Sequence, residues 1–371
     1  MRPVRHDRGT QTGARPPTGP VVLVVGARPN FMKIAPLQAE LDRRGIGSIL
    51  VHTGQHYDEA MSGVFFDVLG IRPPDHHLEV GSASHAVQTA RIMEAFEPVV
   101  LATDPSWVVV PGDVNSSMAC SLVAAKLGAP VAHLEAGLRS GDWAMPEEIN
   151  RVVTDRVSTL LLAPSIDAVD NLRAEGYPES SIAFVGNIMA DTLLANIERA
   201  RARPILADLG LEPGAYGMVT LHRPSNVDDP ATLTRLIGAL EEVARTTPLV
   251  WPVHPRIRTK LELSPAICTL EPLGYLDALA LQAGARMVLT DSGGMQEETT
   301  ILGVPCVTLR TTTERPITVT HGTNQLVGTG PDEITHAVDR VLAGAITGGR
   351  PERWDGTTAR RVVDAMESHR R

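Results

Sequence analysis

The sequence predicts an α/β protein built from two units, each a parallel sheet with helices on both faces. The chain has 371 residues, which is more than one hydrophobic core usually organises. Short apolar runs alternate with helical stretches along nearly the whole chain, a pattern typical of parallel sheets. Polar loops follow the apolar runs directly, and ligands of such folds gather at the carboxyl ends of the strands.

The composition argues against several functional classes. The chain carries 43 acidic and 34 basic side chains, a formal net charge of −9, which argues against a broad nucleic-acid-binding face. No apolar run approaches the roughly 18 residues of a membrane span. The three cysteines, Cys120, Cys268 and Cys306, have no zinc-site spacing, and their odd number argues against a disulfide framework. We therefore expect a cytoplasmic protein with no metal site and no nucleic-acid or membrane partner.

The first unit is expected at residues 21–187. Residues 1–20 contain arginines and prolines but no apolar stretch, and predict a disordered extension rather than a targeting segment. The continuous apolar run 21–25, which ends at a glycine, predicts a strand buried on both faces. Further strands are predicted at 49–51, 108–110, 131–134 and 182–185, and helices at 31–44, 59–69, 85–103, 116–127 and 147–159.

The second unit is expected at residues 188–350 and repeats the alternation. Strands are predicted at 218–221, 249–253, 287–290 and 306–309, and helices at 231–245, 276–283, 296–302 and 333–342. The charged residues of 351–371 predict a solvated terminal helix, which we expect to pack back on the first unit.

The loop after the first strand has the residue types of a phosphate site. Residues 26–30 (GARPN) include Arg28, and Lys33 lies one helical turn further on. A glycine turn at a helix N-terminus with two nearby cations suits a phosphate. The loop matches neither GxGxxG nor GxxxxGK[ST], so neither a nicotinamide dinucleotide nor a P-loop nucleotide is indicated. The alternative interpretation is a surface turn with solvated charges.

Carboxylates follow the next strands of the first unit. Asp113 comes after the strand at 108–110, and its commoner use at this position is to cap a helix. Glu135 directly follows the apolar strand 131–134, where an unpaired buried carboxylate would be costly. Glu147 follows a proline, an arrangement that also opens ordinary helices.

Polar loops also end the strands of the second unit. His222 and Arg223 follow one strand, and His254 follows another. The segment 290–298 runs from a strand through Ser-Gly-Gly into a helix, where backbone N–H groups can approach an anion. Glu298 lies one turn into that helix, in reach of a sugar hydroxyl. Together with the cations of the first loop, these residues suggest a diphosphate held between the two units.

These segments together resemble the non-hydrolysing UDP-N-acetylglucosamine 2-epimerase family over roughly residues 21–345. The resemblance implies a GT-B-like fold, with two Rossmann-like domains around a central cleft. It also implies a cytoplasmic homodimer that interconverts UDP-GlcNAc and UDP-ManNAc without NAD or a metal. It rests on GARPNFMKIAPL (26–37), HTGQHYD (52–58), GDVNSS (112–117), HLEAGLRSGDWAMPEEINR (133–151), LHRPSN (221–226), DSGGMQEE (291–298) and TTERPITV (312–319).

The resemblance also implies a mechanism and a set of site residues. UDP leaves by elimination across C1–C2, giving a 2-acetamidoglucal, and adds back with protonation of C2 from the opposite face. Asp113 and Glu135 match the proton-transfer carboxylates, and Glu147 assists or positions them. The other matches are His222, Arg28 and Lys33 around the diphosphate, Ser292, Gly293 and Gly294 as its backbone cradle, Glu298 at the ribose, and Arg315 as a further substrate-site arginine.

The sequence departs from the family pattern in one loop. Many bacterial members have Gln-His-Arg-Glu where this chain has Gln-His-Tyr-Asp at 55–58. In those members Gln55, His56 and His254 correspond to a second, activating UDP-GlcNAc site, and the missing arginine puts that regulation in doubt. Alternative functions are an epimerase of another UDP-2-acetamido sugar such as a UDP-diacetamido-uronic acid, a hydrolysing epimerase, a GT-B glycosyltransferase and a nucleotide-sugar sensor. The three carboxylates favour an epimerase.

Overall fold

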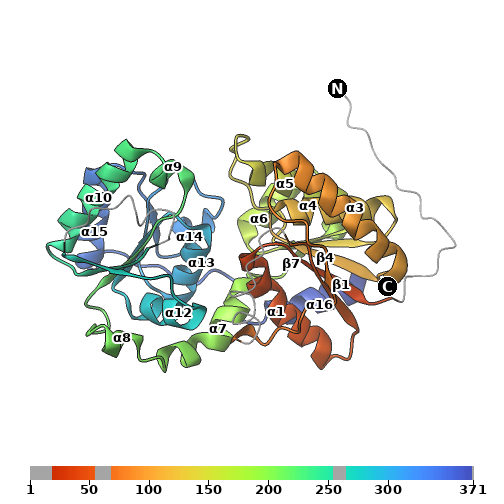
Figure 1. Ribbon diagram of the computed structural model, residues 1–371, viewed down its shortest axis with the longest axis horizontal. Coiled ribbons are helices and arrows are strands. Elements are labelled where there is room, and N and C mark those ends of the chain that lie inside the picture. Colours follow the sequence, from red (N-terminus) through yellow and green to blue (C-terminus); the bar gives the residue numbers. More distant parts are fainter. Residues whose placement is uncertain (1–18, 55–67, 254–264, 370–371) are drawn as a thin grey trace.

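The computed structural model describes residues 19–54, 68–253 and 265–369, which form two lobes (Figure 1). Each lobe contains one parallel sheet with helices on both faces, so the predicted α/β class with two sheets is confirmed. None of the helices in these ranges is both long and apolar enough to cross a bilayer.

The first lobe is built on a seven-stranded sheet with the order β3-β2-β1-β4-β5-β6-β7. Alternate residues of β1 enter different cores. Leu23 packs with α1 on one face, and Val24 packs with α3 and α4 on the other. The strands are β1 Val21–Val25, β2 Ser48–His52, β3 His76–His77, β4 Trp107–Pro111, β5 Val131–Leu134, β6 Leu160–Ala163 and β7 Ile182–Phe184. The helices are α1 Arg28–Arg43, α3 His85–Thr103, α4 Asn115–Lys126, α5 Pro146–Val157, α6 Ile166–Ala174 and the 3₁₀ turn η1 Glu179–Ser181.

The second lobe has a six-stranded sheet with the order β10-β9-β8-β11-β12-β13. In each sheet the strand order reverses beside the first strand, and such a reversal opens a binding crevice at the carboxyl ends of the strands. The strands are β8 Gly217–Thr220, β9 Leu249–Pro252, β10 Ile267–Leu270, β11 Met287–Thr290, β12 Cys306–Thr308 and β13 Asn324–Leu326. The helices are α8 Ile205–Asp208, α9 Pro224–Val227, α10 Pro230–Ala244, α12 Tyr275–Gly284, α13 Gly293–Leu302, α14 Ile317–Thr320 and α15 Pro331–Leu342.

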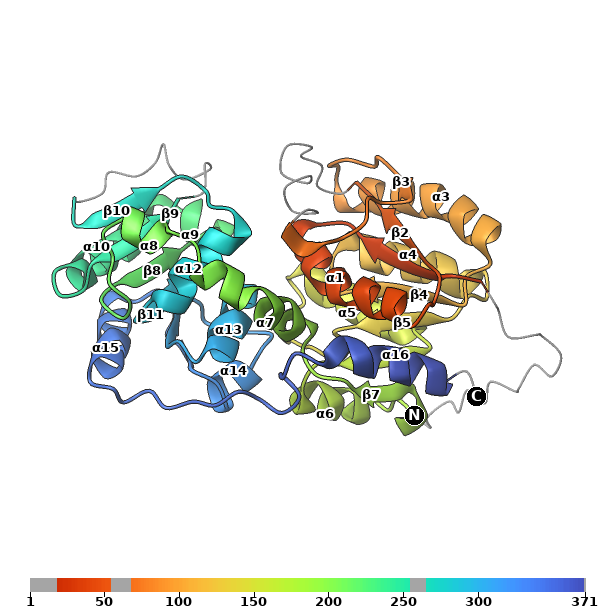
Figure 2. The same cartoon turned by 90° about the horizontal axis from the view of Figure 1, so that it is seen from below.

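Two helices join the lobes. The helix α7 (Ile188–Arg201) packs against α1 of the first lobe and against α12 and α13 of the second. The helix α16 (Thr358–His369) follows the second lobe in sequence but lies beside α1 of the first lobe (Figure 2). It also contacts β6. Just before α16, the buried Trp354 donates from Nε1 to the carbonyl of Pro164 at 3.0 Å.

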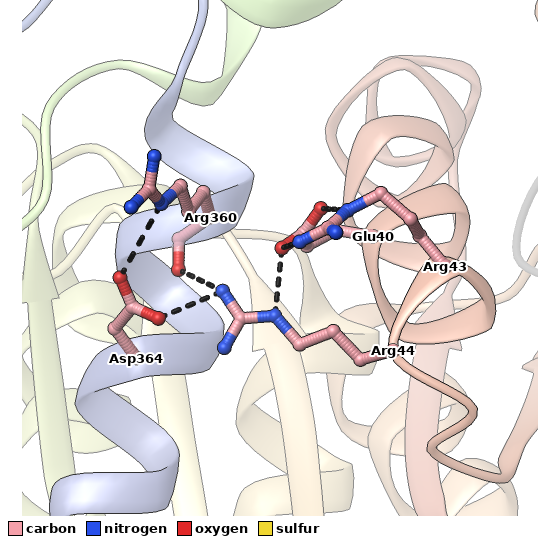
Figure 3. A pocket seen from close by; sticks show the side chains of 5 residues that line it. All are labelled: Glu40, Arg43, Arg44, Arg360 and Asp364. Atoms are coloured by element: carbon pink, nitrogen blue, oxygen red, sulfur yellow. Dashed lines mark hydrogen bonds and ion pairs between the residues drawn. The ribbon is translucent and has the colours of Figure 1, made fainter.

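The face of α16 toward the first lobe is apolar and its edge is ionic. Ala359, Val362 and Met366 are buried at helical spacing, so only part of the helix is solvated as predicted. At the edge, Arg44 of the first lobe binds Glu40 and Asp364, each at 2.7 Å (Figure 3). Of these two pairs only the one with Asp364 attaches α16, and because Asp364 is half exposed it contributes little, so the buried stripe supplies most of the attachment.

The predicted elements agree best with the structure where the apolar pattern is strong. The helix 85–103 and the strands 131–134 and 287–290 have the predicted bounds. The sequence analysis did not predict several elements, namely β3, β6, β10, β13, α6, α7, α8, α9, α14 and the turn η1. The predicted helix 59–69 falls largely outside the described residues, as does the extension before residue 19. The division near residue 187 stays a prediction, and Asn187 itself caps α7.

Candidate active site

Glu135 lies at the carboxyl end of β5 in an unusual backbone conformation. Its φ is +76°, in the left-handed region that a residue with a side chain rarely occupies. The N–H groups of Glu135 and Ala136 both donate to the carbonyl of Leu162, which holds this turn. The carboxylate is buried, and within the described ranges its Oε1 has no hydrogen-bond partner. One oxygen of this buried carboxylate is therefore left without a hydrogen bond from the described residues.

The other oxygen of Glu135 meets cations from both lobes. Lys33 of α1 donates from Nζ to Oε2 at 2.7 Å, and Nη2 of Arg315 lies 3.5 Å from the same oxygen. Gly112 makes this approach feasible, because a Cβ at that position would lie 2.9 Å from Nζ of Lys33. The structure thus brings the predicted residues Lys33, Glu135 and Arg315 together. The ammonium group of Lys33 is already paired with the carboxylate of Glu135.

Asp113 lies at the end of β4, beside the same cluster. Its Oδ2 accepts from Nη2 of Arg151 at 2.5 Å. Burial alone would raise the pKa of Asp113, but the charges of Arg151 and Lys33, with that of Arg315, outweigh burial and lower it. The N-cap of α4 is Val114, so the helix-cap interpretation of Asp113 does not hold. Asp113 is a partly exposed, ionised carboxylate at the site.

The helix α5 begins with two glutamates that lie in different surroundings. Glu148 is buried, accepts from Ser140 and Gly141, and binds Arg151 at 2.7 Å. Glu147, the predicted site residue, is exposed in the first turn of α5. Its charge acts on Arg223 of the second lobe, where it opposes the lowering of the arginine pKa by burial. Glu147 therefore lies within electrostatic range of the second lobe. It also forms part of the Pro-Glu-Glu opening of α5, the alternative that the sequence analysis gave.

The first loop differs from the phosphate cradle that the sequence suggested. The N–H groups of Gly26 and Ala27 both donate to Oδ1 of Asn30 at 3.0 Å, so they are already satisfied. Arg28 is the first residue of α1, and its side chain lies outside the described part of the structure. The predicted regulatory residues Gln55, His56 and His254 also lie outside the described ranges.

In the second lobe, Asp291 organises the loop that carries His222. Asp291 is fully buried at the end of β11 and accepts from the N–H groups of His222 and Arg223. Burial alone would raise the pKa of Asp291, but the bonds from His222 and Arg223 lower it. Nδ1 of His222 lies 3.0 Å from Oδ1 of Asp291, and the imidazole is half exposed. The other ring nitrogen is therefore free to meet a ligand.

The N-terminus of α13 is covered by a carboxylate that the sequence analysis did not consider. Ser292 caps the helix, and Gly293 and Gly294 form its first turn. A Cβ on Gly293 would lie 2.5 Å from Oε1 of Glu314. Glu314 is buried and binds Nη2 of Arg310 at 2.9 Å. Burial opposes ionisation, but Arg315 and Arg310 outweigh it and hold the pKa of Glu314 at about 2.

Two neighbouring glutamates of α13 carry raised pKa values. Burial raises the pKa of Glu297, although Nε of Arg315 lies 2.7 Å from its Oε1. Asn187 donates to the same oxygen at 3.0 Å. Burial and the charge of Glu297 raise the pKa of Glu298 to about 7, so the predicted ribose contact titrates near neutral pH.

A pocket of about 410 Å³ lies between the lobes and is lined by residues of the loop that follows β8. Asp142 and Met145 line it from the first lobe, and Arg223 and Arg310 from the second. In the described ranges no three His, Cys, Asp or Glu side chains are grouped to hold a metal. The structure thus places the carboxylates of Asp113 and Glu135 on the first lobe, and the loops of His222 and Ser292, which follow strands, on the second.

Sequence reasoning named no role for the ionic partners that hold the predicted residues. Asp291 directly follows a strand, so the rule that singled out Glu135 would also have found it. The same rule would have found Arg310, which directly follows the predicted strand 306–309. The remaining partners lie at positions without a strand-end signal. The overlooked partners are Arg151, Asp155, Asp291, Glu297, Arg310 and Glu314.

Comparisons with known proteins identify the family to which the chain belongs. A family model described as UDP-N-acetylglucosamine 2-epimerase matches residues 39–367. The UDP-N-acetylglucosamine 2-epimerase of Methanococcus maripaludis is 39% identical over 334 residues, covering 86% of this chain and 91% of the relative. The UDP-2,3-diacetamido-2,3-dideoxy-D-glucuronate 2-epimerase of Pseudomonas aeruginosa is 40% identical over 353 residues, covering 93% and 99%. The crystal structure of Methanocaldococcus jannaschii UDP-GlcNAc 2-epimerase with UDP-GlcNAc and UDP superimposes with a TM-score of 0.84 at 38% identity, covering 93% of this chain and 99% of that one.

Proposed function

Because this chain belongs to the UDP-N-acetylglucosamine 2-epimerase family, whose members are isomerases acting on carbohydrates, we propose that it inverts C2 of UDP-GlcNAc to give UDP-ManNAc. The observation that carries the proposal is the pair Asp113 and Glu135 at adjacent strand ends. Cations hold each carboxylate, Arg151 at Asp113 and Lys33 at Glu135.

The chemistry requires such a pair. The hydrogen on C2 is not acidic, so inversion without an oxidant proceeds by eliminating UDP across C1–C2 and adding it back. The steps need a base on one face of the sugar and an acid on the other. In the proposal, Asp113 and Glu135 are this base and this acid: one removes the proton from C2 and the other donates a proton to C2 from the opposite face. The unpartnered Oε1 of Glu135 is the oxygen that meets the substrate.

The second lobe holds the departing diphosphate in this proposal. His222 presents its outer ring nitrogen, because Nδ1 lies against Asp291. Ser292, Gly293 and Gly294 offer the positive end of the α13 dipole, which stabilises the negative charge that develops on UDP. Glu298 meets the ribose. Arg315 spans the two halves, since it contacts both Glu135 and Glu297.

A deuterium experiment tests the reaction. Purified protein incubated with UDP-GlcNAc in D₂O without NAD should form UDP-ManNAc and place one deuterium at C2, as seen by NMR. Release of free ManNAc and UDP would instead indicate a hydrolysing epimerase. Absence of deuterium uptake with every UDP-2-acetamido sugar would overturn the proposal.

A second candidate substrate is a UDP-2,3-diacetamido-uronic acid. The Pseudomonas aeruginosa relative named for that sugar is 40% identical and covered over 99% of its length. Arg223 and Arg310 are among the residues that line the interlobe pocket, and arginine suits a carboxylate at C6. The ratio of kcat/KM for the two sugars decides between them.

The proposal includes the assembly and the location that the resemblance implies, a homodimer in the cytoplasm. Light scattering of the purified protein after size-exclusion chromatography tests the homodimer. A molar mass near 39.7 kDa, that of one chain, would contradict it.

A further inference from the structure

We infer that His133 is a positioning residue, a doubly protonated imidazole that fixes Asp113 and Glu135 relative to each other. The inference rests on the proposed function, because its importance lies in the placement of these two carboxylates. His133 is on β5, two residues before Glu135, and its side chain is fully buried.

Both ring nitrogens of His133 face acceptors. Nδ1 lies 2.6 Å from Oδ1 of Asp155 on α5, and Nε2 lies 2.9 Å from the carbonyl oxygen of Gly112. A carbonyl oxygen accepts and cannot donate, so Nε2 carries a hydrogen.

Asp155 is ionised, so Nδ1 must donate as well. Its Oδ2 accepts from the N–H of Gly137 at 3.1 Å and lies 2.7 Å from Nη2 of Arg139. The guanidinium of Arg139 favours the carboxylate form of Asp155. With hydrogens on both nitrogens, the imidazole of His133 is a cation paired with Asp155.

This one ring joins the two loops that carry the carboxylates. The carbonyl that it holds belongs to the peptide between Gly112 and Asp113, where Gly112 has a φ of +65°. The N–H of Gly112 donates to Leu134, the residue between His133 and Glu135. Beyond Glu135, the N–H of Gly137 is bound by the same Asp155. The ends of β4 and β5 are therefore tied to each other and to α5.

The helix α5 also holds the side chain of Asp113. Arg151, one helical turn before Asp155, binds that carboxylate, while Asp155 holds its backbone through His133. A neutral imidazole has one N–H. Because the carbonyl of Gly112 and the carboxylate of Asp155 can only accept, a neutral ring could keep only one of these two bonds. Loss of the bond to Gly112 would release the peptide that precedes Asp113.

Two conservative variants separate the two bonds of His133. In His133→Asn the amide takes the place of Nδ1 and can reach only Asp155. In His133→Gln the amide takes the place of Nε2 and can reach Gly112. We expect kcat to fall about 100-fold in His133→Asn and less than about tenfold in His133→Gln, because small misplacements of reacting groups are costly. The Kd for UDP should stay within about threefold, since the residues proposed to bind UDP are mainly on the second lobe.

The matched control is His336→Asn, which alters an exposed histidine on α15 of the second lobe and should leave kcat unchanged. Wild-type kcat in both His133 variants would overturn the inference. Equal losses of kcat in the two variants, accompanied by weaker UDP binding and a lower Tm, would assign His133 a merely structural role and would also overturn it.

Nitrogen-15 NMR of histidine-labelled protein at pH 7 tests the ring without turnover. The His133 signals, assigned by their loss in His133→Asn, should show hydrogens on both nitrogens. An unprotonated ring nitrogen would contradict the inference even if the enzyme is active. A doubly protonated ring in a wild-type protein that turns over no UDP-2-acetamido sugar would leave this protonation standing and refute the proposed function.

Discussion

Single charged side chains in the cleft are held by partners of opposite sign, two of them from distant parts of the chain and one from four residues earlier. Asp113 is held by Arg151, Glu135 by Lys33, and Glu314 by Arg310. Buried ions that are paired keep their charge at neutral pH, whereas a buried carboxyl without a close cation does not. Glu298 is the contrasting case, with a pKa of about 7.

The pH dependence of UDP binding follows from Glu298. Ribose hydroxyls donate to a carboxylate, so binding favours the ionised form and lowers the Glu298 pKa from about 7. A proton is then released on binding, and affinity rises with pH. We expect the Kd for UDP to fall up to about tenfold between pH 6 and pH 8. Calorimetry on wild type and Glu298→Gln measures this difference.

The glutamine variant is the control because UDP itself titrates in this range. Its Kd should change only as much as the phosphate titration requires. An identical pH dependence in wild type and Glu298→Gln would show that this carboxyl does not contact the ribose.

Glu314 places a negative charge where the diphosphate is proposed to bind. Glu314→Gln keeps the side-chain volume and removes the charge beside Gly293, so we expect UDP to bind roughly tenfold more tightly. The variant should be less stable at pH 7, because Arg310 loses its counter-ion. Calorimetry with UDP and denaturant unfolding measure the two effects, and weaker binding in the variant would contradict this role.

The stability difference should depend on pH in a defined direction. The folded pKa of Glu314 is about 2, below the ordinary value of 4.5, so its stabilisation is fully present above pH 4.5. This stabilisation is lost as the pH falls toward 2. The free energies of unfolding of wild type and Glu314→Gln should therefore converge at acid pH.

Among the secondary-structure elements, the segment between β5 and α5 is shaped by residues whose backbone is in the left-handed conformation. Glu135, Gly137 and Gly141 all have positive φ angles between the strand and the helix. The turn at Glu135 is held by Leu162 and the one at Gly137 by Asp155. The strain at Glu135 is thus maintained by neighbouring elements, which is how functional sites keep sparsely populated conformations.

Gly137 and Gly141 provide a matched pair of substitutions. Gly137→Ala should lower the free energy of unfolding by about 3 kcal/mol or more, because the new Cβ would lie 2.3 Å from the carbonyl of Ala168. Gly141→Ala meets no atom within 4 Å and should cost only about 1–2 kcal/mol for its left-handed backbone. Urea unfolding compares the two, and equal losses would refute the steric argument.

The sequence predicted those elements whose local pattern is strong. The strand 131–134 and the helix 85–103 combine a continuous apolar run or helical periodicity with a clear beginning and end. The two-residue strand β3 is formed by two histidines and has no apolar pattern at all. The run at 160–163 is apolar, but it directly follows a helix with no glycine or proline between them.

The candidate site was predictable in part for the same reason. A carboxylate or a Ser-Gly-Gly turn directly after an apolar strand can be recognised in the sequence itself. This pattern predicted Asp113, Glu135 and Ser292 as site residues. The ionic partners are fixed by the tertiary structure. Arg151 is 38 residues from Asp113, and no local pattern joins them. The buried carboxylate of Glu314 became recognisable only from its contact with Gly293.

The molecule as a whole is held together by α7 and α16. One hydrophobic core includes residues of β1, α1 and α16 and extends through α7 to α12. The lobes are therefore not joined by a simple linker, and Glu135 of the first lobe contacts Arg315 of the second. The stability of the first lobe depends on a segment that follows the second lobe in sequence.

Val362→Ala tests this dependence. Val362 is fully buried on α16, so its truncation should cost about 1–3 kcal/mol. Hydrogen exchange should increase in α1 and β6 and remain unchanged in β8 and β11. The matched control is Val338→Ala on α15, buried to a similar degree, which should increase exchange in the second lobe. Increased exchange in the second lobe alone for both variants would contradict the packing role of α16.

The return of α16 to the first lobe also sets an order of events during synthesis. A ribosome translates residues 188–357 after the last strand of the first sheet and before α16. Throughout that interval the apolar surface of α1 and β6 that α16 covers has no occupant from its own chain. The first lobe therefore completes its core after the second lobe has been made, and the nascent chain presents an exposed apolar surface to chaperones until then.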